Sequence, residues 1–163
     1  MDEAEFTAWA VAHQRRLLRS AYLLTGDSFR AQDLVQEALV KVAMRWPRLR
    51  DGNPMAYARM IVVRDNISWW RRRRDVLGLG PPADRASDTQ DPEVAVVVQR
   101  ALSRLTARQR AVIVLRHFDD LSEAETASLL GVGVGTVKST NAAAIARLRD
   151  GAPELLALIG RTG

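Results

Sequence analysis

The chain has 163 residues, of which 47% are hydrophobic and 26% charged, so it is long enough for one globular domain or two small ones and has the composition of a folded protein. It holds no cysteine and only two histidines, which excludes disulfide frameworks, thiolate metal sites and cysteine nucleophiles and argues against a histidine-rich metal site. Because no apolar run reaches about 18 residues, we expect no membrane insertion, and the lack of cysteine suits the reducing cytoplasm.

The formal net charge of +5 is unevenly divided along the chain. Residues 1–74 carry a net charge of +6, residues 75–92 carry −3, and residues 93–163 carry +2. A basic unit, an acidic connector and a weakly basic unit indicate two modules that face a polyanion.

Three helices are expected before residue 75, over about 3–24, 28–46 and 54–74, with a polar loop over 48–53. Asp27 follows a Thr-Gly break and is an N-cap for the second helix, and Pro47 is expected to end that helix. Asn53 followed by Pro54 gives an N-cap and a first-turn proline for the third helix.

The connector over 75–92 is rich in Gly, Pro, Asp and Ser and has no apolar period. This composition predicts a flexible linker that lets the flanking modules move independently.

After the connector, four helices are expected, over about 91–105, 106–118, 122–130 and 134–149. Two of them begin with capping boxes, at Thr106 with Gln109 and at Ser122 with Glu125. Because no segment alternates as a strand does, the predicted fold is all-α, in two small helical bundles. The predicted division is 1–74, a linker over 75–92, 93–150, and a short C-terminal tail over 151–163.

The stretch from Glu123 has the spacing of a helix-turn-helix. Small Ala127 falls where two helices touch, Gly131 falls in the turn, and Val137 falls on the core side. A helix starting near Val134 would then be placed to enter a DNA major groove. An ordinary helical hairpin that ends in glycine fits the same pattern about equally well.

The third helix ends in two tryptophans and four arginines, over 68–74. Indole rings beside guanidinium groups suit unpaired bases and backbone phosphates. The alternative is a core tryptophan and a solvated helix end. Neighbouring residues point about 100° apart on a helix, so we expect one indole buried and one nearer DNA.

Asp33, Gln36 and Glu37 lie on one face of the second helix, opposite its apolar stripe. An anionic patch on a basic module is unsuited to DNA. It is either solvated surface or a contact for another protein.

The order of these features resembles an extracytoplasmic-function (ECF) sigma factor, the small two-domain promoter-recognition subunit of bacterial RNA polymerase. The resemblance covers about residues 4–150 and is most similar to a small actinobacterial subfamily. It is carried by the stretches YLLTGD at 22–27, QDLVQE at 32–37, NPMAY at 53–57, SWWR at 68–71, TARQRAV at 106–112, LSEAE at 121–125 and VGTVKS at 134–139.

The resemblance implies a role for each module. The region 2 domain, 1–74, would bind the clamp helices of the largest polymerase subunit through Asp33, Gln36 and Glu37. It would also recognise and melt the −10 element through Asn53, Tyr57, Arg59, Arg64, Trp69, Trp70, Arg71, Arg72, Arg73 and Arg74. The region 4 domain, 93–150, would contact the −35 element through Gly133, Thr136, Lys138, Ser139 and Asn141.

The resemblance further implies binding to core polymerase, its flap included, binding to promoter DNA, control by an anti-sigma factor, a monomeric free form and no cofactor. Many relatives carry Asn near Arg64 and Arg near Met60, so Arg64 is expected to contact phosphate. The run over 140–144 is poor in charge and predicts a weak −35 contact.

Two other classes of function compete with this reading. A helix-turn-helix regulator would bind duplex DNA without polymerase, but it has no need of the acidic face on the second helix. An enzyme has little support, because the sequence shows no catalytic triad, glycine-rich phosphate loop or metal-ligand cluster.

Overall fold

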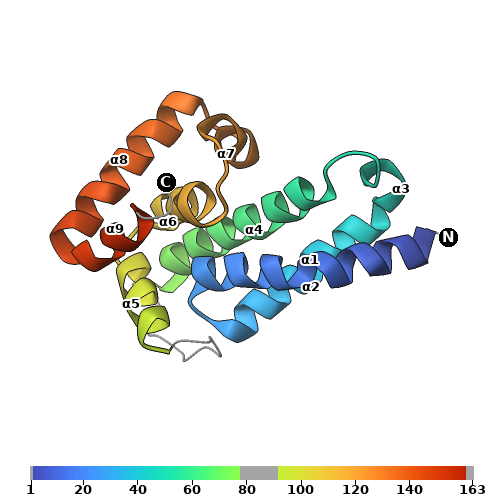
Figure 1. Ribbon diagram of the computed structural model, residues 1–163, viewed down its shortest axis with the longest axis horizontal. Coiled ribbons are helices and arrows are strands. Elements are labelled where there is room, and N and C mark those ends of the chain that lie inside the picture. Colours follow the sequence, from blue (N-terminus) through green and yellow to red (C-terminus); the bar gives the residue numbers. More distant parts are fainter. Residues whose placement is uncertain (1, 78–91, 161–163) are drawn as a thin grey trace.

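The structure, a computed structural model, describes residues 2–77 and 92–160, and every regular element in these ranges is a helix. This confirms the all-α fold predicted from the sequence. An N-terminal bundle of α1 to α4 lies beside a C-terminal bundle of α5 to α9 (Figure 1). Residues 78–91, which hold most of the predicted linker, lie outside the described ranges. The helices are α1 (Asp2–Thr25), α2 (Ser28–Met44), α3 (Trp46–Leu49), α4 (Pro54–Leu77), α5 (Pro92–Ser103), α6 (Ala107–Ile113), the π-helix η1 (Val114–Phe118), α7 (Glu123–Leu130), α8 (Val134–Gly151) and α9 (Pro153–Ile159).

The N-terminal bundle is built on the apolar faces of α1, α2 and α4. Leu17 and Leu24 of α1, Val42 of α2 and Val62 of α4 are almost completely buried. The predicted N-cap is confirmed, because the Asp27 carboxylate accepts hydrogen bonds from the backbone N–H groups of Phe29 and Arg30 at the start of α2.

The short helix α3 was not predicted. The sequence placed Trp46 at the end of the second helix and a loop after it, whereas α2 ends at Met44 and the chain turns at Arg45. The turn buries the Trp46 indole against Phe6 and Trp9, each with its ring centroid 5.5 Å away. Aromatic packing therefore decides where α2 stops, and Pro47 lies in the first turn of α3.

The C-terminal bundle contains the predicted helix-turn-helix, formed by α7 and α8. Gly131 ends α7 with a φ of 68°, a left-handed conformation that favours glycine. Ala127 and Val137 are buried together with Val112 of α6, which fixes the two helices on the bundle. The roles expected for Ala127, Gly131 and Val137 are thus confirmed.

A π-helical turn follows α6 and determines where Asp119 lies. The backbone N–H of Asp119 donates to the carbonyl of Val114, five residues earlier, so the chain is one residue wider here than an α-helix. Asp119 is buried, and the next residue, Asp120, has a positive φ of 54°. The wide turn therefore directs Asp119 away from solvent, toward the N-terminal bundle.

Part of the predicted C-terminal tail over 151–163 is helical, as α9. Pro153 stands in its first turn, Glu154 follows, and Leu155 is completely buried. The apolar side chains of α9 complete the core of the bundle beside α8 and α5. Burial of Leu155 supplies the driving force that a seven-residue helix lacks alone.

The two bundles are packed together through one continuous apolar core. Helix α4 runs between them, with α1 and α2 on one side and α6 and α7 on the other (Figure 1). The sequence predicted bundles that move independently. In this conformation they are closed on each other, because polar side chains as well as apolar ones pair across the seam.

Removing the cap of α7 tests how far local signals stabilise the helix-turn-helix. The Ser122 hydroxyl accepts from Glu125 N–H at 3.0 Å, and the Ser122 N–H donates to the Glu125 carboxylate, which holds the pKa of Glu125 below its usual value. We expect Ser122→Ala to cost about 1 kcal/mol in urea denaturation. The control is Ser128→Ala, an exposed position within the same helix. Equal midpoints for the two variants would show that the capping box contributes nothing.

Candidate functional surfaces

The acidic patch on α2 is exposed. Asp33, Gln36 and Glu37 all face solvent, opposite the buried Leu34 and Ala38. Nothing in the described part of the structure packs on them, so they are available to another protein.

Three exposed apolar side chains extend this patch along the same helix face. Phe29, Val40 and Met44 are 72%, 51% and 80% exposed, and with Asp33 and Gln36 they follow the three- and four-residue spacing of one face. Sequence reasoning assigned no role to these three residues, although their spacing places them on the same face as the acidic patch. We call the set of Phe29, Asp33, Gln36, Glu37, Val40 and Met44 the α2 face.

The predicted −10 residues at the start of α4 have structural roles in this conformation. The Asn53 side chain accepts from Ala56 N–H at 2.9 Å and caps the helix. Tyr57 is half-buried, with the Arg45 guanidinium 5.4 Å from its ring centroid. Both lie beside α3, where an open loop was expected.

Further along α4, two of the predicted −10 residues turn toward the C-terminal bundle. Arg59 is buried, and its Nε lies 3.6 Å from the Asp119 carboxylate. The Nε of Arg64 donates to the backbone carbonyl of Leu129 at 3.0 Å. Sequence reasoning could not assign these partners, which are 60 and 65 positions away.

The two tryptophans near the end of α4 are both half-buried, so the expectation that one of the indoles is buried is wrong. They meet edge to face, with centroids 5.1 Å apart. The guanidinium carbon of Arg30 lies 3.6 Å from the Trp69 ring centroid, and that of Arg73 lies at 5.1 Å. Burial lowers the pKa of Arg30 to about 10. The Trp69 ring therefore already makes cation–π contacts with Arg30 and Arg73.

The arginine run that follows is not uniform. Arg71, Arg72 and Arg74 are exposed, whereas Arg73 is half-buried against Trp69. Together with Trp70, Arg71 and Arg74 line a hollow of about 430 Å³, whose other wall is formed by Ser103, residues 105–108 and Arg110 of the C-terminal bundle. The hollow lies in the seam between the bundles, so part of the basic end of α4 faces the other bundle.

The predicted −35 residues gather at the start of α8. Gly133, Thr136, Lys138 and Ser139 are exposed there, beside Gly135 and Ala142. The Lys138 ammonium lies 3.7 Å from the Glu123 carboxylate on α7. The half-buried Asn141 pairs with His117 through Oδ1 and Nε2 at 3.0 Å. The Ser139 hydroxyl donates to the Thr136 carbonyl at 3.1 Å, so three of the five predicted residues have side-chain partners within the bundle.

Comparison with known families shows to which class of protein this chain belongs. Residues 4–76 match the family model described as Sigma-70 region 2, and residues 95–148 match the one described as Sigma-70, region 4. The RNA polymerase sigma-E factor of Streptomyces avermitilis is 38% identical over 153 residues, which cover 90% of this chain and 84% of that protein. The ECF RNA polymerase sigma factor SigM of Mycobacterium tuberculosis is 37% identical over 142 residues, covering 83% and 71%. The chain belongs to the ECF sigma factors.

Solved sigma factors share this fold. The sigma factor RpoE of Bartonella quintana, solved in complex with the anti-sigma factor NepR, is similar with a TM-score of 0.73 and 25% identity, covering 89% of this chain and 94% of that one. CnrH, solved with the cytosolic domain of CnrY, is similar in fold with a TM-score of 0.65 and 23% identity, covering 89% and 85%. Both were solved with a second protein bound.

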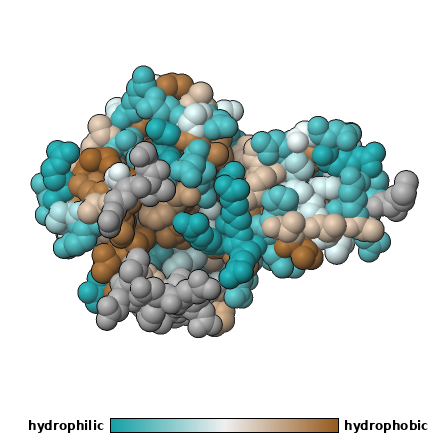
Figure 2. All heavy atoms as spheres, viewed as in Figure 1, coloured by the Kyte–Doolittle hydropathy of each residue, from teal (hydrophilic) through white to brown (hydrophobic). Residues whose placement is uncertain are grey.

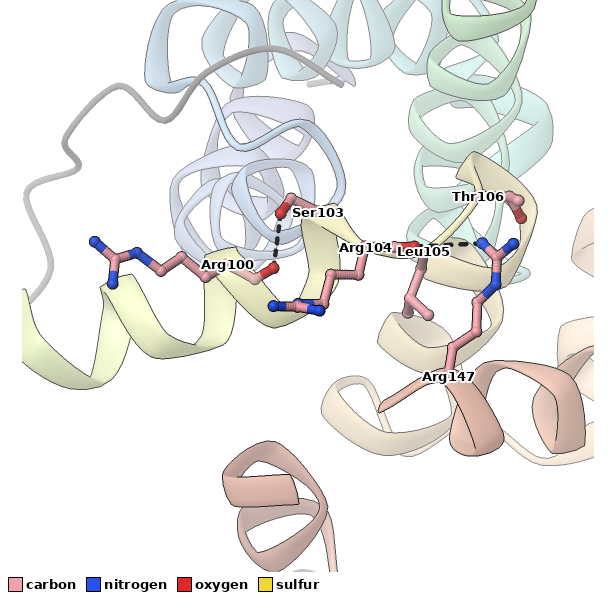
Figure 3. A pocket seen from close by; sticks show the side chains of 6 residues that line it. All are labelled: Arg100, Ser103, Arg104, Leu105, Thr106 and Arg147. Atoms are coloured by element: carbon pink, nitrogen blue, oxygen red, sulfur yellow. Dashed lines mark hydrogen bonds between the residues drawn. The ribbon is translucent and has the colours of Figure 1, made fainter. Parts of the chain in front are cut away.

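The region 4 bundle of this sigma factor has two further surface features. Apolar residues gather over α5 and α9 (Figure 2), where Val96, Val97 and Leu158 are 43%, 39% and 40% exposed. Nearby, a hollow of about 640 Å³ is lined by Arg100, Ser103, Arg104, Leu105, Thr106 and Arg147 (Figure 3). Arg147 reaches across from α8 and donates to the Arg104 carbonyl and to Gln109, so its position is fixed by the bundle itself.

The described residues hold neither a candidate metal-binding cluster nor a candidate membrane-spanning helix. Between 2 and 77 and between 92 and 160, no group of three or more His, Asp or Glu side chains could hold a metal ion. In the same ranges, no helix is both long and apolar enough to cross a membrane.

Proposed function

We propose that this ECF sigma factor binds core polymerase through the α2 face, opens the −10 element with the basic end of α4, and anchors weakly on the −35 element through α8. The single observation that supports this division best is the contrast within the N-terminal bundle. The α2 face is exposed and combines acidic with apolar side chains. The end of α4 instead combines arginines with tryptophans. Two such faces suit a protein partner and DNA at the same time.

The proposed partner of the α2 face is the pair of clamp helices in the largest polymerase subunit. Asp33 and Glu37 supply charge, and Val40 and Met44 supply the apolar area that a stable interface centre needs. Because all of these side chains are exposed already, binding would require no rearrangement of the bundle.

The proposed −10 contact uses Asn53, Tyr57, Arg59, Arg64 and the segment from Trp69 to Arg74. Exposed Arg71, Arg72 and Arg74 would bind phosphates, and Trp70 would offer a stacking face. Trp69 stays in the proposed set as the side chain that positions Arg30 and Arg73.

The proposed −35 contact uses Gly133, Thr136, Lys138, Ser139 and Asn141. Thr136 and Ser139 carry hydroxyls that suit phosphate or base edges. The charge of Lys138 is partly neutralised by Glu123, and Asn141 is held by His117, which supports a weak contact.

Two further partners complete the proposal. The polymerase flap would meet the exposed apolar residues over α5 and α9, Val96, Val97 and Leu158. An anti-sigma factor would control the protein, as NepR is bound to the similar RpoE. The sigma factor itself would be monomeric when free, act in the cytoplasm beside the polymerase, and leave catalysis to the polymerase.

Transcription from mapped promoters tests this function. Purified core polymerase with the sigma factor should give run-off transcripts from discrete start sites across a genomic fragment library, and either component alone should give none. A sigma factor that binds duplex fragments but never directs a transcript would instead favour the second candidate, a helix-turn-helix regulator that works without polymerase. The helix-turn-helix of α7 and α8 is the observation that keeps this alternative in view.

A further inference from the structure

The seam between the bundles is joined by polar contacts that no local sequence signal requires. At one end, the Arg110 guanidinium donates to the Leu23 carbonyl and to the Gln99 side chain, both at 2.6 Å, and Gln99 donates to the Tyr22 carbonyl. These bonds tie the C-terminal end of α1 to α5 and α6. The acceptors in these three hydrogen bonds are neutral oxygens.

The other end of the seam is charged and centres on Asp119. The Ser20 hydroxyl of α1 lies 2.8 and 3.0 Å from the two Asp119 carboxylate oxygens, and Arg59 of α4 lies 3.6 Å from one of them. All three side chains are less than a tenth exposed. One carboxylate from the C-terminal bundle is thus held by two helices of the N-terminal bundle.

Arg59 is incompletely satisfied there. Its Nε and one terminal nitrogen are buried without a hydrogen-bond partner in the described part of the chain. Burial lowers the pKa of Arg59 and raises the pKa of Asp119, although each charge attracts the other. Burial disfavours the charged form of both groups, so their attraction has to offset the desolvation of two charges. A better ligand for Arg59 would therefore displace Asp119.

A DNA phosphate is such a ligand, because it offers several anionic oxygens to the planar guanidinium. Part of the remaining −10 surface also faces the C-terminal bundle. Arg64 is bonded to the Leu129 carbonyl, and Trp70, Arg71 and Arg74 line the seam hollow against Ser103 and residues 105–108. Opening the seam would release all of them together.

We propose that Asp119 is an intramolecular substitute for a DNA phosphate: it occupies Arg59 and closes the region 4 bundle over the −10 surface of region 2. The sigma factor would then be self-masked against nucleic acid until the seam opens. This inference rests on the proposed −10 role of α4, and it adds that Asp119 competes with DNA phosphate for Arg59.

Asp119→Asn tests the proposal directly. Asparagine keeps the size of the side chain and an oxygen for Ser20 but leaves the charge of Arg59 buried without a counter-charge, which destabilises the closed seam strongly. The control is Asp120→Asn, the same chemical change at the exposed neighbouring residue, where asparagine tolerates the positive φ. Since the chain has no cysteine, Ala43→Cys and Ala146→Cys, one exposed position in each bundle, provide a dye pair for energy transfer.

Two readouts on the full-length protein without polymerase follow closure and masking separately. Asp119→Asn should lower energy transfer between the dyes and tighten binding to a fluorescein-labelled oligodeoxythymidine on the order of tenfold, a usual size for such coupling. Asp120→Asn should change neither. Adding Arg59→Ala to Asp119→Asn should remove the gain in binding, because the side chain that binds the phosphate is then gone together with the unpaired charge that opens the seam.

Unchanged energy transfer in folded Asp119→Asn would overturn the proposal, since Asp119 would not hold the seam. An opened seam with unchanged oligonucleotide binding would overturn it too, since the seam would then mask nothing. If circular dichroism shows that Asp119→Asn is unfolded, Ser20→Ala decides by the same two readouts with smaller changes. Run-off transcription separates these failures from failure of the proposed function: Asp119→Asn should transcribe with core polymerase as wild type does, and only a silent wild type would count against that function.

Discussion

Replacing Gln36 with alanine and Glu37 with lysine is expected to abolish binding to core polymerase while leaving the sigma factor folded. The two side chains are exposed at the middle of the α2 face, so the double change removes a hydrogen-bonding group and reverses a charge at the centre of the proposed interface. Exposed substitutions of this kind usually change stability by no more than about 0.5 kcal/mol. Co-elution with core polymerase on a sizing column and the thermal melting midpoint report the two effects.

A matched control separates loss of contact from general damage. Gln14→Ala with Glu3→Lys makes the same two chemical changes at exposed positions of α1, in the same bundle. This variant should co-elute as wild type does. If Gln36→Ala/Glu37→Lys still binds core polymerase with wild-type affinity, the α2 face is not the polymerase contact.

The exposed apolar residues of the α2 face provide a second test of the same contact. Phe29, Val40 and Met44 are too exposed to stabilise the bundle, so aspartate at Val40 or Met44 should weaken polymerase binding at unchanged melting temperature. An effect confined to the acidic residues would show that the interface is held by charge alone.

The sequence predicted those features whose cause is local. The N-cap Asp27, the capping box at Ser122 and the left-handed turn at Gly131 depend on residues within a few positions, and each is present. The helix-turn-helix followed from the same kind of signal. The acidic part of the α2 face was also visible, because three polar residues shared one face of a predicted helix.

Features that depend on distant partners were missed. Ser20 and Asp119 are 99 positions apart. Without knowledge of such a partner, a polar residue on a helix is predicted to face solvent. The π-turn before Asp119 has no periodic signature, and α3 exists because Trp46 packs on Phe6. For α9, Pro153 lies in the first turn of a helix that forms because Leu155 is buried in the bundle, which the sequence alone does not show.

These missed contacts change how the basic residues should be tested. Four consecutive arginines suggested one electrostatic surface, yet Arg73 stacks on Trp69 and its Nε is buried without a hydrogen bond in the part of the chain described. Replacing Arg73 would therefore disturb the bundle as well as the DNA contact. Exposed Arg71, Arg72 and Arg74 are the informative positions.

Alanine at Arg71, Arg72 and Arg74 is expected to reduce open-complex formation far more than Lys138→Ala does. The triple variant removes three exposed cations beside Trp70, and stacking with phosphate neutralisation is the combination that holds single strands. Lys138 is a single cation already 3.7 Å from the Glu123 carboxylate, so its loss removes less than one full charge from the DNA surface. Permanganate footprinting of the melted region on a native promoter measures both effects in holoenzyme.

Salt dependence distinguishes a phosphate contact from a general loss of charge. Each phosphate contact adds about 0.7 to the salt slope on single strands, so the triple variant should have a slope lower by about 2 if all three arginines bind phosphate. Arg15→Ala with Arg149→Ala removes two exposed cations outside the proposed surfaces and should leave both the slope and the footprint as in wild type. Should Lys138→Ala prove the more damaging change, the −35 contact through α8 would be the stronger anchor, and the basic end of α4 would serve the closed seam more than the open complex.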